Sequence, residues 1–143
     1  GRALEGDALN AALEDAWAAW VNDSFWLNAP SKCFDDGTQR QLVKDDEGTH
    51  LLVAYTSGGK TPGDAYLWDV GETLPTAWRM WTHAIPVGGV HVTWDSWVQL
   101  GTGAWIATKH KIGPKTLELT DVRGAKTLAE VEPGEDPFAR LVQ

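Results

Sequence analysis

The sequence predicts an α+β domain that is mostly β: a curved antiparallel half-barrel sheet with one amphipathic helix across its concave face. Two patterns support this fold class. One segment, residues 7–21, has apolar residues at three- and four-residue spacing, which is typical of an amphipathic helix. Between residues 24 and 122, large or apolar residues instead alternate with other residues in short runs. These runs are separated by turns that contain Gly and Pro, which indicates a meandering antiparallel sheet.

The helix is the strongest local prediction. Asp7 is the expected N-cap, because its side chain can accept from free N–H groups of the first turn. Asn22 and Asp23 are expected to end the helix. The apolar stripe is formed by Leu9, Ala12, Leu13, Ala16, Trp17, Trp20 and Val21. We expect this stripe to face the sheet, so that the helix acts as a lid.

The strands are predicted from alternation and turn residues. A phase slip at Asp95 and Ser96 predicts a bulge that presents Trp97 as well as Trp94. Residues 57–64 have the composition of a loop. Strands are expected at residues 24–27, 38–44, 50–56, 65–70, 77–83, 90–100, 104–109 and 116–122.

The chain of 143 residues is expected to be a single domain over residues 1–143. Its parts would be the lid helix, the sheet over residues 24–122, and a tail over residues 123–143 held by Phe138 and Leu141. The chain begins at Gly1 without an initiator Met or a signal peptide, and a helix pattern follows almost at once. This pattern indicates that an N-terminal portion is lacking.

Charge and hydropathy exclude two classes of partner. The net charge is -8 and the basic residues are scattered, which argues against nucleic acid. The longest basic stretch, residues 109–111, is interpreted as a solvated strand end. No apolar run approaches the roughly 18 residues of a membrane span, so we do not expect an integral membrane protein.

No constellation of residues predicts catalysis, a metal or a cofactor. None of Ser24, Ser57 and Ser96 lies in a nucleophile motif. The one cysteine, Cys33, is interpreted as a small core residue. Metal binding would need converging histidines, and only His83 and His91 are expected to face each other across a hairpin. We therefore predict a non-enzymatic protein.

Nine tryptophans are more than a core of this size usually needs. Each one alone is best explained as core. Together, with large indoles on both faces of single strands, they predict the wall of an apolar cavity, because an indole offers a wide apolar surface. The candidate ligand-binding residues are Trp17 and Trp20 above the sheet, and Tyr66, Trp68, Trp78, Met80 and Trp94 along one face of it.

Several of these segments resemble the later strands of outer-membrane lipoprotein-sorting proteins, the lipoprotein-carrier superfamily. An uncharacterised bacterial subgroup is similar over Trp20–Leu27 followed by Thr61–Asp64. The resemblance implies a half-open barrel with helices over an apolar cavity, of which this chain would be the C-terminal two-thirds. The matching segments are Tyr66–Val70, Leu74–Pro75, Trp78–Trp81 and Val92–Trp97.

By this resemblance the chain would bind or carry an apolar small molecule or lipid, such as an acyl chain or a lipoprotein anchor, in the periplasm or at the outer membrane. Two alternatives stay open. Exposed tryptophans would also suit a glycan-binding module, and tryptophans buried against another envelope protein would suit a structural module. The direction in which the indoles point distinguishes them: a covered concave wall favours an apolar ligand, and a flat exposed platform favours a sugar.

Overall fold

The computed structural model describes residues 3–57, 61–136 and 139. It begins with helix α1 (Gly6–Asn28) and the 3-10 helix η1 (Ala29–Phe34), and a short helix α2 (Leu128–Val131) lies near the end. The strands are β1 (Thr38–Asp45), β2 (Gly48–Tyr55), β3 (Ala65–Val70), β4 (Pro75–Trp81), β5 (Val90–Thr93), β6 (Asp95–Gln99), β7 (Trp105–Ile112) and β8 (Lys115–Glu118).

The predicted class is confirmed, because the strands form one antiparallel sheet that stays open. Its order is β1-β2-β3-β4-β5-β7-β6, and β8 pairs with the other edge of β7. Between β5 and β6 the chain bends at Trp94, and Ser96 has a φ of 55°. The predicted bulge is not present as a shift in register, because Val92 pairs with Ile112 and Trp97 with Ala107 in one register. The irregular backbone at Ser96 nevertheless lets both Trp94 and Trp97 pack on the core side of the sheet.

Helix α1 is longer than predicted. The structure continues it through Asn22 and Asp23 to Asn28, so the strand expected at residues 24–27 is wrong. Tertiary packing explains the difference, because Phe25 and Trp26 pack against the sheet and outweigh the weak helix propensity of the two polar residues. Asp7 lies in the first turn rather than at the N-cap, which is Glu5.

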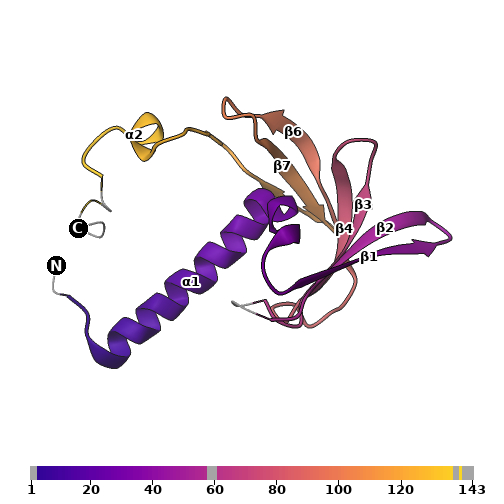
Figure 1. The fold of residues 1–143 in the computed structure, drawn as a ribbon, viewed down its shortest axis with the longest axis horizontal. Coiled ribbons are helices and arrows are strands. Elements are labelled where there is room, and N and C mark those ends of the chain that lie inside the picture. The colour runs from indigo at the N-terminus through magenta and orange to yellow at the C-terminus, as the bar shows by residue number, and fades with distance from the viewer. Residues whose placement is uncertain (1–2, 58–60, 137–138, 140–143) are drawn as a thin grey trace.

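The face that α1 turns to the sheet also differs from the prediction. Trp17 and Trp20 are 44% and 55% exposed, whereas Phe25 is buried. Trp20 and Phe25 lie about 140° apart around the helix at 3.6 residues per turn. Of the predicted stripe, Val21 packs against the core, whereas Trp17 and Trp20 do not. Figure 1 shows the N-terminal half of α1 projecting away from the sheet.

One face of the sheet carries the core. The residues that share this face include Val53 and Tyr55. Cys33 is buried beside them, and burial raises the pKa of its thiol to about 11, so the thiol stays protonated at neutral pH. The interpretation of Cys33 as a small core residue is confirmed. Phe138 and Leu141, expected to hold the tail, lie outside the described residues.

The packing of α1 predicts an unequal response along the helix. Phe25→Ala should lower the free energy of unfolding by about 3 to 4 kcal/mol, because it leaves a cavity against the sheet. Leu13→Ala, at a side chain that is 59% exposed, should lower it by less than about 1 kcal/mol. Urea unfolding followed by circular dichroism measures both. Equal costs would show that α1 packs along its whole length.

Candidate functional site

The predicted tryptophan face exists in the structure. Antiparallel pairing places Trp68 opposite Trp78 and Tyr66 opposite Met80, and the next strand places Val92 opposite Trp78. The rings of Trp68, Trp78 and Trp94 contact one another, with centroids 4.8 to 5.2 Å apart. Register and phase, both readable from the sequence, therefore bring these side chains together as predicted.

Only part of this face borders open space. Between α1 and strands β3 and β4 lies a groove of about 370 Å³. Trp68 and Trp94 do not line it, because they pack behind Trp78 in the core. The apolar lining consists of Ala18, Val21, Phe25, Trp26, Tyr66, Trp78, Met80, Ala84 and Ile85. Its size is at the lower end of the range of about 300–1,000 Å³ for small-molecule sites.

The helix side of the groove was missed in the sequence, although a signal was present. Ala18, Val21, Asn22, Phe25 and Trp26 follow the spacing i, i+3, i+4, i+7, i+8. This is a second helical stripe, beside the stripe that contains Trp17 and Trp20. It was overlooked because residues 24–27 were interpreted as a strand.

The groove has a polar end at Asp64 and His83. The Oδ1 atom of Asp64 accepts a hydrogen bond from the backbone N–H of His83 at 2.9 Å and from its Nδ1 at 3.0 Å. The backbone of Asp64 is held as well, by Tyr55 N–H and the Thr61 carbonyl, both at 2.9 Å. Gly63 has a φ of 94°, and a Cβ there would collide with the His83 ring. The carboxylate is thus fixed in place. His83 follows β4 and does not face His91, which pairs with Arg79.

Trp17 and Trp20 border a second hollow of about 320 Å³, which shares Val21, Phe25 and Thr61 with the groove. The two indoles stack on each other with centroids 5.1 Å apart. The ammonium group of Lys32 lies 4.9 Å from the centroid of Trp20, a cation–π distance. The two predicted residues thus lie beside the groove, not above the tryptophans of the sheet.

Three buried nitrogen atoms behind the groove lack a hydrogen-bond partner within the described residues: Nε1 of Trp78, Nε1 of Trp94 and Nε2 of His110. His110 was expected on a solvated strand end, but it is fully buried between Trp26 and Trp94. Burial lowers the pKa of His110, although the nearby carbonyls of Thr93 and Trp26 offset part of this effect. Its imidazole is therefore neutral at pH 7.

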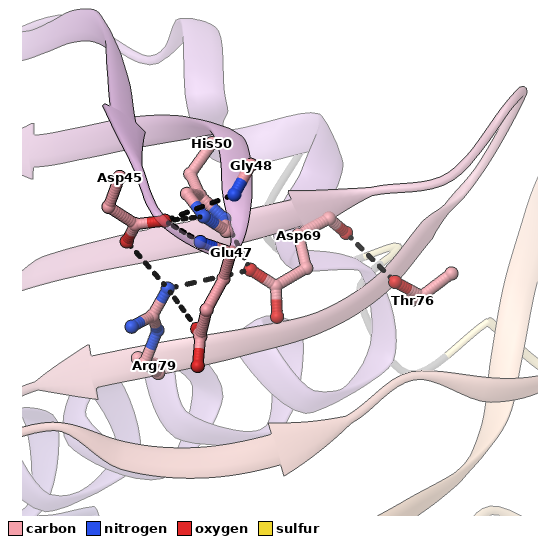
Figure 2. A network of polar contacts seen from close by, with 7 residues as sticks. All are labelled: Asp45, Glu47, Gly48, His50, Asp69, Thr76 and Arg79. Carbon is pink, nitrogen blue, oxygen red and sulfur yellow. Dashed lines mark hydrogen bonds and ion pairs between the residues drawn. The ribbon is translucent and has the colours of Figure 1, made fainter.

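The opposite face of the sheet carries a separate ionic network, which Figure 2 shows. The ring nitrogens of His50 lie 2.7 Å from Asp69 Oδ1 and 2.9 Å from Asp45 Oδ1. The Nη2 atom of Arg79 lies 3.4 Å from Glu47, 3.5 Å from Asp45 and 3.9 Å from Asp69. Hydrogen bonding to Asp45 is the largest of the causes that raise the pKa of His50. With both nitrogens facing carboxylates, the imidazolium form can donate twice.

Three residues of this ionic network are arranged like the ligands of a metal site. Asp45, Glu47 and His50 offer ligand atoms within 4.8 Å of one another. These atoms already pair with each other and with the guanidinium of Arg79, which bridges the carboxylates. A metal ion would have to displace Arg79. The network is best explained as a set of ion pairs that connects the β1–β2 turn to strands β3 and β4.

Comparison with known proteins gives no match: no family model, curated protein or solved structure matches the chain. The resemblance to lipoprotein carriers therefore stays a prediction. In the part of the chain that the structure describes, no helix is long and apolar enough to cross a membrane.

The ionic network predicts a pH dependence. The pKa of His50 is raised above 6.5, so its stabilising contribution is complete below that pH and is lost as the pH rises through the folded-state pKa. We expect the difference in free energy of unfolding between the wild type and His50→Gln to be constant below about pH 6 and to shrink above it. Denaturant unfolding from about pH 5.5 to about pH 9 measures this difference.

His110 contributes to the pH dependence with the opposite sign, because its neutral form is favoured in the folded state. Since both proteins contain His110, this contribution cancels in the difference between their free energies of unfolding. Asp45, whose pKa is lowered chiefly by His50, stays ionised over this range. His91→Gln, at an exposed histidine, is the matched control and should give no such trend. If the difference in free energy of unfolding between the wild type and His50→Gln did not change with pH, the neutral imidazole of His50 would be sufficient to stabilise the network.

Proposed function

We propose that this protein is a non-catalytic binding protein for a small apolar ligand, which lies in the groove between α1 and strands β3 and β4. The observation that carries the proposal is the groove itself. It is concave, and its lining is mainly aromatic and aliphatic. The polar members of the lining are Asn22, Thr61, Asp64, Thr82 and His83. Tyr66, Trp78 and Met80, three of the predicted binding residues, form its sheet side.

The orientation of the indoles favours this function over glycan binding. A sugar platform needs indole faces that are flat and open. Trp17 and Trp20 are exposed, but they turn their faces toward each other with planes only 16° apart, and Lys32 lies over Trp20. Trp68, Trp78 and Trp94 are buried in the sheet. The arrangement therefore fits a covered apolar site better than a platform.

The cell envelope is the proposed location, and the resemblance to lipoprotein carriers is its support. Carriage of an acyl chain or a lipoprotein anchor belongs to the same proposal. A groove of about 370 Å³ would hold a short segment of a chain or a ring system.

The proposal predicts that filling the groove abolishes binding. Ala18 lines the groove and is exposed at the surface of α1, so a larger side chain there should not disturb the core. Ala18→Phe should weaken binding of the neutral fluorescent probe N-phenyl-1-naphthylamine by at least about tenfold, because the ring occupies the space of the ligand. Titration followed by probe fluorescence measures the dissociation constant.

Ala19→Phe is the matched control, because Ala19 is also an exposed alanine of α1 and does not line the groove. This variant should bind the probe as the wild type does, and circular dichroism should show both variants to be folded. Absence of saturable binding by the wild type, or equal weakening in both variants, would contradict the proposed site.

A further inference from the structure

The charge on the wall of the groove restricts the ligand further. Among the described residues that line it, Asp64 is the one carboxylate, and no Lys or Arg is present. Asp64 is 9% exposed, and the two hydrogen bonds that its side chain accepts within the described residues both involve Oδ1 and come from His83. A negative charge at this degree of burial attracts a cation more strongly than a surface carboxylate would, because water screens it less.

The remaining walls reinforce this preference. Four aromatic side chains line the groove: Phe25, Trp26, Tyr66 and Trp78. The faces of such rings carry partial negative charge and attract cations, most strongly where water is excluded. Apolar aromatic walls and one fixed carboxylate are the two features that recognise an alkylated ammonium group.

The second hollow, which Trp17 and Trp20 border, differs from the groove in its charge. There the protein supplies its own cation, because the ammonium of Lys32 lies 4.9 Å from the ring centroid of Trp20 and 5.6 Å from that of Phe25. The described lining of the groove has aromatic rings and no Lys or Arg, and its carboxylate pairs with the ring of His83, which is charged only when it is protonated.

We propose that the groove binds a small organic cation, an alkylated ammonium that carries an apolar substituent, with its charge at Asp64 and its apolar part against the aromatic and aliphatic lining of the groove. This inference rests on the proposed function and narrows its ligand. The net charge of -8 adds a long-range attraction for cations. A free carboxylate, as in a fatty acid, would be repelled by Asp64.

The test compares two probes of one shape. Benzyltrimethylammonium and its uncharged carbon isostere, neopentylbenzene, differ in the charge of one atom. Both are measured by displacement of N-phenyl-1-naphthylamine from the full chain. We expect the cation to bind at least about tenfold more tightly than the isostere. Benzoate, as an aromatic anion, should bind more weakly than either.

Asp64→Asn tests the role of the carboxylate. It should reduce the cation-to-isostere ratio by at least about threefold while the isostere still binds. The ratio is taken within one variant, so it does not depend on the fraction of that variant that is folded. Asp46→Asn, at an exposed residue next to the β1–β2 turn, changes the net charge equally and should leave the ratio unchanged.

Vesicles of phosphatidylcholine form a second arm, because they present the same trimethylammonium group on a lipid. If the cation is preferred and the vesicles compete with it for the groove, the ligand is a lipid headgroup. If the cation is preferred and the vesicles do not compete, the ligand is a free small molecule. Equal binding of cation and isostere would overturn this inference and leave the proposed function standing. Failure of every probe, including N-phenyl-1-naphthylamine, would overturn both.

Discussion

The contact between the last two turns of α1 and the aromatic face of the sheet determines most of the remaining structure. Phe25 lies 5.4 Å from both Tyr55 and Tyr66, and Trp26 lies against Trp78 and His110, as ring centroids. Because the helix is anchored only at this end, its N-terminal half leaves the sheet (Figure 1). The groove is the space that this divergence leaves beside the contact.

The two faces of the sheet stabilise the fold through different interactions. On one face, aromatic rings pack in edge-to-face, tilted and stacked pairs and supply the apolar burial that stabilises the fold. On the other, His50 and Arg79 compensate three carboxylates and tie the β1–β2 turn to the middle of the sheet (Figure 2). A dense aromatic core leaves little room for polar partners, which is why the indole N–H groups of Trp78 and Trp94 find no hydrogen-bond partner among the described residues.

The candidate site combines a fixed carboxylate with a mainly apolar wall. Asp64 is fixed by its own backbone hydrogen bonds and by those from His83, so it does not need to reorganise when a ligand binds. The opposite wall belongs to α1, where Trp26 is half-buried and Ala18 is exposed. A pre-organised carboxylate beside an apolar wall favours a small ligand that carries a positive charge.

The sequence by itself determined the fold class, most of the strands after residue 37, and the shared face of Tyr66, Trp68, Trp78, Met80 and Trp94, because alternation fixes which side of a strand each residue occupies. The strand expected at residues 24–27 was wrong. The sequence could not decide which of two helical stripes meets the sheet. Both stripes of α1 have apolar spacing, and the choice depends on packing between segments that are distant in sequence. The Asp64 end of the groove was likewise decided only by tertiary structure, because a loop carboxylate carries no periodic signal and is placed by the strands that flank it.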